Sequence, residues 1–378
     1  MNTFKPVKTA LIGSGMISGI YLENCCKNLK ILELCGCSDL IPERSAARAE
    51  EYGIRQMTNE EILSDPSIEL VINTTYPAAH YEVAKAALEA GKHVYTEKMI
   101  APSFEEAREL RELARSKGLF YCGAPDTFLG ATFQTARRIL DGGLIGTPVA
   151  AAAILARSYH HERFYTGDQK RFAFCPSGGV IFDMGSYYLT ALVSLLGGIR
   201  EVCGFAEIRN PHRVYQNPDS PHYQEPMEVE SWNNAAGALR FENGVLATLM
   251  TTSESGGFEN GLTIYGTEGR LTVGDPNEYG VPLTLTTKAT GCTQLPMTHA
   301  YGSGNHRGIG PAEMAYAIRA GRVPRTEEMP VHVLEAAQGI CRSGETGTIY
   351  QMTTRCGRPA PLPAGYTENP ELSLSISD

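Results

Sequence analysis

Residues 7–18 read VKTALIGSGMIS, and they set the beginning of the fold. Val7 to Gly13 is a short apolar run that ends in glycine, which is typical of a buried strand followed by a tight turn. Apolar side chains then recur at helical spacing, at Met16, Ile17, Ile20, Tyr21 and Leu29. Residues 31–39 have the pattern of a second strand. The stretch therefore predicts one βαβ unit with a glycine-rich turn between its first strand and its helix.

The glycine-rich turn has the spacing of a dinucleotide-binding loop. Gly13 and Gly15 let the backbone approach a pyrophosphate, which then binds the N–H groups at the start of the helix, next to Met16 and Ile17. Ser18 stands where this fingerprint prefers glycine or alanine. Asp39 closes the second strand, where an acidic side chain accepts hydrogen bonds from a ribose 2′-hydroxyl and repels a 2′-phosphate. The motif predicts NAD rather than NADP; a tight turn with a surface aspartate is the alternative.

The alternation of strands and helices continues to about residue 125. Strands are predicted at 31–39, 70–74 and 93–98, and helices at 42–52, 77–90 and 103–118. Thr58 with Glu61, and Ser103 with Glu106, have the spacing of capping boxes. Parallel strands need long crossovers, so this rhythm predicts an α/β domain over residues 1–125, with a doubly wound parallel sheet of Rossmann type.

The rhythm changes after residue 126. Strand-like segments follow one another at 147–157, 199–209, 235–241, 245–252, 262–266 and 270–273, and helical segments return at 310–320 and 331–342. Asn243-Gly244, between two alternating runs, is a strong hairpin signal. We expect an α+β domain over residues 126–378 with a large, mostly antiparallel sheet. Residues 209–230 are predicted to form a functional or disordered loop, and the proline-rich tail after Arg358 to wrap a surface.

Composition limits the classes of function. A formal net charge of −9 does not fit the clustered Lys and Arg of a nucleic-acid-binding protein. No apolar run reaches the roughly 18 residues of a membrane span, and the first residues have no signal-peptide pattern. We therefore expect no membrane partner and a cytoplasmic location. The 10 cysteines form no CxxC pair, which predicts reduced thiols and no metal site.

Three further stretches carry more specific motifs. They are residues 71–80, VINTTYPAAH; residues 87–98, ALEAGKHVYTEK; and residues 177–188, SGGVIFDMGSYY. Together they resemble the glucose-fructose oxidoreductase, inositol dehydrogenase and MocA (Gfo/Idh/MocA) family, and the resemblance covers nearly the whole chain. It implies a Rossmann domain, a second domain with an open sheet, and a nicotinamide cofactor between them. It also implies a homo-oligomer, a dimer or tetramer, in which open sheets pair face to face.

Glu97 and Lys98 end the predicted strand 93–98, at the sheet edge where doubly wound folds bind ligands. In the family a Glu-Lys-Pro signature lies there, and its lysine contacts the substrate hydroxyl near the nicotinamide; here Met99 replaces the proline. The resemblance implies that Lys98 is catalytic and that Glu97 and Lys98 lie at the cofactor. Burial and a cationic nicotinamide are expected to lower the pKa of Lys98 toward a useful range. A surface salt bridge is the alternative.

The run from Asp183 to Tyr188 departs from the commonest family pattern, which has histidine at the position of Tyr187. In the family that histidine takes the hydroxyl proton, so the resemblance implies catalytic roles for Asp183 and Tyr187 and substrate contact by Tyr188. One branch of the family has this Asp-Met-Gly-x-Tyr-Tyr sequence. Tyrosine, with a reference pKa of about 10, is a poor base at neutral pH unless a cation lowers its pKa. Tyr187 has two open roles: it relays the proton, or it only packs and orients the substrate.

Other side chains are candidates for the same site. His161 is a candidate replacement base, and His160 and His306 are candidate substrate contacts, although a lone histidine is more often an ordinary surface or core residue. Asp126 begins the crossover into the second domain, where the family often contacts substrate. The resemblance also implies cofactor contacts after the strand 70–74, from Thr74, Thr75, Tyr76 and His80.

The residues and the resemblance lead to one main hypothesis and two alternatives. The main hypothesis is NAD-dependent oxidation of a secondary hydroxyl on a sugar, glycoside or cyclitol, with a preference for ring carbon three because the chain resembles the Tyr-Tyr branch. The first alternative is redox-assisted lyase or hydrolase chemistry that retains its NAD. The second is an NAD-binding sensor without turnover, motivated by Met99 and Tyr187 in place of family residues.

Overall fold

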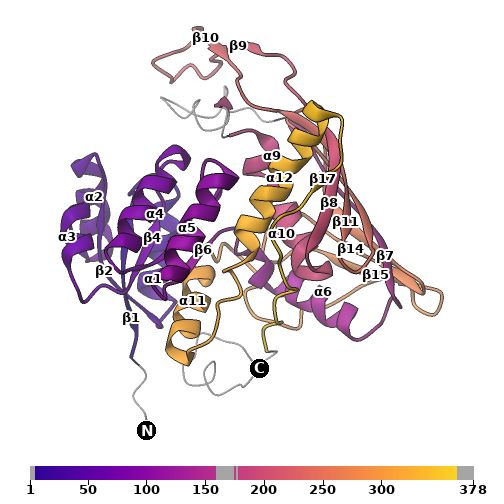
Figure 1. Ribbon diagram of the computed structural model, residues 1–378, viewed down its shortest axis with the longest axis horizontal. Coiled ribbons are helices and arrows are strands. Elements are labelled where there is room, and N and C mark those ends of the chain that lie inside the picture. Colours follow the sequence, from indigo (N-terminus) through magenta and orange to yellow (C-terminus); the bar gives the residue numbers. More distant parts are fainter. Residues whose placement is uncertain (1–4, 159–173, 176–177, 364–378) are drawn as a thin grey trace.

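The beginning of the chain folds into a six-stranded sheet with the Rossmann strand order. The computed structural model describes residues 5–158, 174–175 and 178–363 (Figure 1). The order is β3-β2-β1-β4-β5-β6, and every neighbouring pair is parallel, so the predicted doubly wound sheet is confirmed. The strands are β1 (Val7–Ile12), β2 (Leu32–Ser38), β3 (Arg55–Gln56), β4 (Leu70–Asn73), β5 (His93–Thr96) and β6 (Tyr121–Gly123).

The helices of this half begin close to the predicted positions. They are α1 (Ser18–Lys27), α2 (Pro42–Tyr52), α3 (Asn59–Ser64), α4 (His80–Glu89), which follows the 3-10 turn Pro77–Ala79, and α5 (Phe104–Ser116). Thr58 and Glu61 form the complete capping box predicted at the start of α3. The second capping box is only half formed: Ser103 accepts the Glu106 N–H at 3.3 Å, but the Glu106 carboxylate binds the Ser103 hydroxyl, at 2.7 Å, rather than its backbone N–H.

The second half is built on a nine-stranded sheet in the order β16-β15-β14-β13-β7-β12-β11-β8-β17. Neighbours are antiparallel except β7 and β12, which are parallel, so the predicted mostly antiparallel sheet is confirmed. The predicted hairpin is also confirmed, because Phe241 donates its N–H to the Val245 carbonyl at 2.9 Å. The strands are β7 (Pro148–Ser158), β8 (Ile199–Glu207), β11 (Asn234–Phe241), β12 (Leu246–Thr252), β13 (Glu254–Gly266), β14 (Gly269–Val273), β15 (Leu283–Thr287), β16 (Gly291–Gln294) and β17 (Tyr350–Gln351).

Helices lie between this sheet and the Rossmann half (Figure 1). They are α6 (Ala131–Asp141), which follows the 3-10 turn Thr127–Leu129, and α9 (Val180–Asp183), α10 (Gly185–Leu196) and α12 (Met329–Thr346). α6, α9 and α10 were not predicted. All twelve residues of α10 are buried, so its sequence has no polar face from which a helical period could be recognised. α9 and α10 bring Asp183 and Tyr187 to the boundary between the two halves.

A late helix, α11 (Ile309–Ala320), returns to the Rossmann half. Arg319 forms an ion pair with Glu69 at 2.7 Å and donates to the backbone carbonyls of Lys5 and Pro6. The boundary at residues 125 and 126 therefore describes the order of the sequence, while α11 belongs in space with the first half. We keep that boundary as a proposal.

The remaining segments are short. The stretch 209–230, predicted to be a loop, contains a two-stranded antiparallel ribbon, β9 (His212–Val214) and β10 (Pro226–Glu228). The described part of the tail wraps the second half as predicted: Leu362 donates its N–H to the Gln134 side chain at 2.7 Å. All ten cysteines lie in the described residues and are free thiols. Across those residues, no helix has the length and apolarity to cross a membrane, and no cluster of side chains could hold a metal ion.

Candidate active site

The glycine-rich turn between β1 and α1 begins with a closely packed glycine and continues with an open one. Gly13 has a φ of 102°, and a Cβ added there would lie 2.5 Å from the backbone nitrogen of Thr75, so only glycine fits. A Cβ on Gly15 would meet nothing within 4 Å. In the described residues, no side chain caps the N–H groups at the start of α1. The turn can therefore accept a phosphate group on these N–H groups.

Asp39 is held beside this turn, at the end of β2. Its carboxylate accepts hydrogen bonds from the backbone N–H groups of Ser14, at 2.7 Å, and Ile41, at 2.9 Å. These bonds fix a negative charge where the ribose of a dinucleotide is expected. On the β4 side of the turn, the Thr74 hydroxyl donates to the Gly13 carbonyl at 2.7 Å. The residues present therefore fit NAD.

The other predicted cofactor residues border the same edge of the sheet. Met16, in the turn, is 65% exposed, and Tyr76, after β4, is 39% exposed, whereas Ile17 is half-buried. His80 is fully buried, and its ring nitrogens lie 2.6 Å from the Met99 carbonyl and 3.1 Å from the Thr75 carbonyl. His80 thus joins the segment after β4 to the segment after β5. Its burial lowers its pKa.

Lys98 follows β5 and connects the two halves of the chain. Its Nζ lies 2.7 Å from Oδ1 of Asp183, the last residue of α9, and the two side chains are only 16% and 4% exposed. Glu97 has a different partner: it accepts a hydrogen bond from the Tyr21 hydroxyl of α1 at 2.5 Å. Lys98 is therefore not part of a surface salt bridge. It is a buried cation aimed from the Rossmann edge at the second half.

The protonation of Lys98 differs from the expectation. Burial alone would lower its pKa, but the negative charge of Asp183, with contributions from Tyr187 and Glu97, raises the pKa above its ordinary value. The prediction that the pKa of Lys98 is lowered is therefore wrong for the protein without cofactor. The sequence did not show how close Asp183 lies to Lys98. Lys98 is an ammonium at neutral pH and acts as a hydrogen-bond donor.

Tyr187, on α10, lies close to two cations. Nζ of Lys98 is 5.7 Å from the centre of its ring, and the guanidinium carbon of Arg307 is 6.0 Å from it. Arg307 donates to the Tyr187 hydroxyl at 3.0 Å and to Oδ1 of Asn277 at 2.9 Å. Burial raises the pKa of Tyr187 and outweighs the lowering by the two cations. Tyr187 is thus a neutral phenol, and because Arg307 can only donate, the phenol proton is left for another acceptor.

Arg307 and Asn277 were missed by the sequence analysis. His306, which was predicted to contact substrate, lies in the glycine-rich loop 302–308, and Arg307 is the next residue. His306 packs edge-on against Tyr279 and Tyr301, with ring centres 5.4 and 5.2 Å away. Its Nε2 is buried without a hydrogen-bond partner within the described part of the chain. The loop therefore supplies an arginine to the site, and the signal that could have identified it was the glycine-rich loop itself.

Two predicted substrate residues bind groups of the protein. Asp126 accepts hydrogen bonds from the Tyr279 hydroxyl at 2.5 Å and from the N–H groups of Gly308, at 3.1 Å, and Gly310, at 2.9 Å, so it fixes the loop that carries Arg307. Tyr188 donates to Asp275 at 3.3 Å. Substrate contact by these residues stays a prediction. His160 and His161 lie outside the described residues.

The geometry brings together groups that exchange protons with an oxygen atom. The ammonium of Lys98, the carboxylate of Asp183 and the phenol of Tyr187 meet at the carboxyl end of β5. This is the sheet edge at which the glycine-rich turn and Asp39 also lie, where doubly wound folds bind their ligands. The arrangement can polarise a hydroxyl or carbonyl oxygen of a small molecule next to a bound dinucleotide.

Comparisons with known proteins agree with this geometry. Residues 7–123 match the family described as an oxidoreductase family with an NAD-binding Rossmann fold, and residues 133–272 match the GFO/IDH/MocA C-terminal domain. An uncharacterized oxidoreductase of Schizosaccharomyces pombe is 30% identical over 280 residues, which cover 70% of each protein. The 1,5-anhydro-D-fructose reductase of Ensifer adhaerens is 29% identical over 325 residues, covering 82% of this chain and 89% of the reductase.

A solved structure shares the fold over nearly the whole chain. Levoglucosan dehydrogenase, in complex with NADH, superposes with a TM-score of 0.81 and 19% identity, covering 93% of this chain and all of the other. The matches to both family domains, together with the NAD-binding turn, determine what kind of protein this is. The chain belongs to the Gfo/Idh/MocA family of oxidoreductases and carries its NAD-binding Rossmann domain.

Proposed function

We propose that this enzyme oxidises a secondary hydroxyl of a sugar, glycoside or cyclitol with NAD. The observation that carries the proposal is the buried pair of Lys98 and Asp183, which lies beside Tyr187 at the edge where the Rossmann half binds its cofactor. Relatives named 1,5-anhydro-D-fructose reductase and levoglucosan dehydrogenase support the substrate class. Within that class we favour ring carbon three of a hexose or glycoside, because Tyr187-Tyr188 resembles the Tyr-Tyr branch of the family.

Lys98 is the group that exchanges the substrate proton. NAD, when bound, supplies the acceptor for the carbon-bound hydride. In oxidation, a deprotonated Lys98 takes the proton of the substrate hydroxyl as the hydride leaves the carbon that carries this hydroxyl. In reduction, the Lys98 ammonium returns a proton to the carbonyl oxygen. Asp183 orients Lys98 through the 2.7 Å ion pair and favours its charged form. In the absence of cofactor, this charge state is the one ready for reduction.

Tyr187 orients the same substrate oxygen. Its hydroxyl accepts a hydrogen bond from Arg307 and keeps its own proton, so it donates to the substrate while Lys98 exchanges the proton. Asn277 and Asn305 hold the guanidinium of Arg307 at 2.9 and 3.0 Å. A rigidly held donor of this kind favours one position of the substrate oxygen. We assign Tyr187 to substrate orientation.

We further propose a cytoplasmic homo-oligomer. The face of the nine-stranded sheet that lies opposite the helices exposes large apolar side chains, at Phe205, Leu246, Met250 and Tyr265; Leu246 and Tyr265 share this face because both pair with Ala150. Cross-strand pairing places Phe205 and Met250 in one row, through Ala236. Several large apolar side chains exposed on one face of a sheet are typical of a surface buried against a second subunit. Free thiols throughout the chain suit a reducing compartment.

A substrate panel tests the function. Purified protein with NAD is offered sugars, cyclitols and aryl glycosides, while NADH is followed by absorbance and the products by mass spectrometry. Net NADH with an oxidised sugar is expected. Released aglycone without net NADH would replace the proposal with redox-assisted elimination by a protein that retains its NAD. Tight NAD binding with no product from any panel member would count against the dehydrogenase and favour a sensor.

A further inference from the structure

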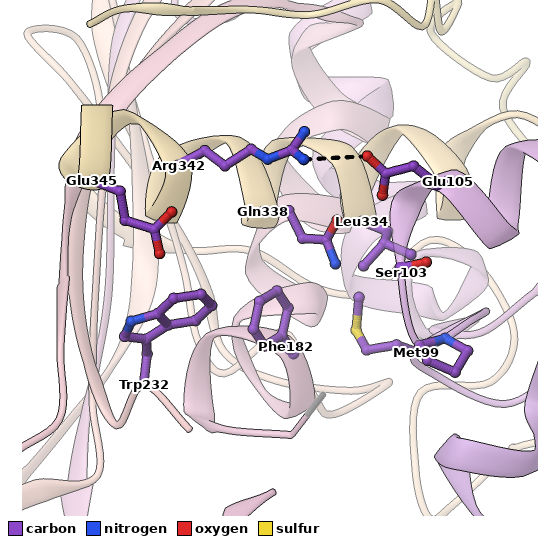
Figure 2. A pocket seen from close by; sticks show the side chains of 10 residues that line it. Met99, Ser103, Glu105, Phe182, Trp232, Leu334, Gln338, Arg342 and Glu345 are labelled. Atoms are coloured by element: carbon purple, nitrogen blue, oxygen red, sulfur yellow. Dashed lines mark hydrogen bonds and ion pairs between the residues drawn. The ribbon is translucent and has the colours of Figure 1, made fainter. Parts of the chain in front are cut away.

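A cavity of about 270 Å³ lies between α5, α9 and α12 (Figure 2). Two of its lining residues, Met99 and Phe182, are the chain neighbours of Lys98 and Asp183. The wall of the cavity is therefore formed by the residues next in sequence to each member of the ion pair. Neither the proposed proton exchange nor the NAD-binding turn uses this space. Its volume is below the roughly 300–1,000 Å³ of pockets that hold drug-sized ligands, and suits a single small ring.

One wall of the cavity is apolar and aromatic. Figure 2 shows Trp232, Phe182 and Met99 side by side along one wall, with Leu334 of α12 facing them. The rings of Phe182 and Trp232 have centres 6.1 Å apart and are tilted by 51°. Phe182 and Met99 are nearly buried, whereas Trp232 is half-buried. Such a wall can stack against the C–H face of a ring-shaped ligand.

The opposite wall carries polar groups from α12. From Met329 to Cys341 every residue of this helix is buried except Gln338, which faces the cavity. The Gln338 side-chain oxygen accepts the N–H of Phe104 at 3.1 Å, so its orientation is fixed. Its NH₂ group has no hydrogen-bond partner among the residues described. A fixed amide with an unused donor that points from a buried helix face into a cavity is a ligand-binding arrangement.

The charges around the cavity favour a neutral ligand. Arg342 forms an ion pair with Glu105 at 3.3 Å, which joins α12 to α5 across the cavity (Figure 2). Glu345 adds a second carboxylate, and Figure 2 shows it pointing toward Trp232. One cation against two carboxylates disfavours phosphate or carboxylate ligands. A hydroxyl group, by contrast, can donate to Glu345 and accept from Gln338.

We propose that this cavity is a second carbohydrate subsite, which holds the sugar ring of the substrate that is not oxidised. The inference rests on the proposed function, because it assigns the cavity to the same substrate. Trp232 stacks on the apolar face of this ring, with Phe182 packed against Trp232 as its support, and Gln338 and Glu345 bind the ring hydroxyls. The enzyme then prefers a disaccharide or glycoside to the corresponding monosaccharide.

Trp232 makes the cavity directly observable, because it is the only tryptophan in the chain. Lys98→Ala protein loaded with NAD is titrated with a disaccharide, and with the monosaccharide that corresponds to its oxidised ring. The disaccharide is expected to change the tryptophan emission in a saturable way, and the monosaccharide to leave it unchanged. A disaccharide that is bound, as shown by calorimetry, without any change in emission would overturn the subsite. This readout does not depend on turnover, so it fails separately from the proposed function.

Kinetics of Gln338→Glu give an independent test. The variant keeps an oxygen for the N–H of Phe104 but loses the NH₂ donor, so the start of α5 stays capped. KM for the disaccharide is expected to rise about 3- to 10-fold, with little change in kcat and in KM for the monosaccharide. Gln294→Glu, the same change on the exposed edge strand β16, is the control and is expected to leave both KM values unchanged. An equal change of KM for both sugars in Gln338→Glu would refute the subsite.

Discussion

The two sides of the active site are built in different ways. The cofactor side uses the backbone of one short turn and a carboxylate bound to it: Ser14 and Asp39 are 25 residues apart in sequence. The substrate side is assembled from distant segments, since Lys98 and Asp183 are 85 residues apart and Tyr187 and Arg307 are 120 apart. The cofactor side is thus fixed by local sequence, whereas the substrate side depends on how the two halves pack. Substrate preference can therefore change while NAD binding is retained.

Lys98→Ala is expected to have the largest effect on the substrate side, because Lys98 is the residue of the first half that pairs with Asp183 of the second half. Loss of the proton-exchanging group is expected to lower kcat about 10²- to 10⁴-fold. The affinity for NAD, measured by calorimetry, is expected to stay within about twofold of the wild type, since the turn and Asp39 are untouched. Unchanged turnover in this variant would remove Lys98 from the chemistry.

Asp39→Ala tests the cofactor side by itself. The change removes the carboxylate expected at the ribose and leaves the N–H groups of Ser14 and Ile41 without their acceptor. NAD is expected to bind about 10- to 100-fold more weakly, as for loss of a hydrogen bond to a charged group. The kcat at saturating NAD is expected to change little. Asp39→Asn, which keeps an acceptor without the charge, serves as the matched variant, and an NADP affinity that rises in both variants would support the role of the charge.

The difference between the two sides also explains what the sequence could predict. The βαβ rhythm, the glycine-rich turn and Asp39 were predictable because each depends on residues close together in the chain. Arg307 was harder to predict, because its glycine-rich loop indicates a functional segment but not that Arg307 meets Tyr187, 120 residues away in sequence. The raised pKa of Lys98 was mispredicted for the same reason, since it depends on Asp183. α10 was missed because it is buried on every side.

Asp183→Asn tests the substrate side through the pH dependence of oxidation. Asp183 raises the pKa of Lys98, and oxidation needs the deprotonated amine, so the wild-type kcat/KM for oxidation is expected to increase with pH through the alkaline range. A neutral asparagine removes the largest of the effects that oppose burial, which lowers the pKa of Lys98. The rising limb of the pH profile is expected to move to lower pH by about one unit or more. A limb that stays in place would mean that Lys98 is not the titrating group.

Arg307→Ala examines the residue that sequence reasoning missed. Tyr187 would lose the donor that fixes its hydroxyl, and the phenol would be free to rotate its proton. We expect kcat/KM to fall about 5- to 10-fold, which corresponds to the loss of one hydrogen bond worth about 1 kcal/mol. In a Tyr187→Phe background, where no hydroxyl remains, the same change is expected to have almost no further effect. Additive losses in the double variant would show that Arg307 acts on the substrate without Tyr187.

The smallest expected effect concerns a glycine in the second half. Gly244 closes the hairpin between β11 and β12 with a φ of 88°, similar in sign to Gly13, but a Cβ there would meet nothing within 4 Å. Gly244→Ala therefore changes only the cost of a left-handed backbone, and denaturant unfolding is expected to show a loss of about 1 kcal/mol. Activity and NAD affinity are expected to stay at the wild-type level. Both glycines have a positive φ, but only Gly13 also packs against a neighbouring strand segment, and this second constraint is what excludes every side chain at Gly13.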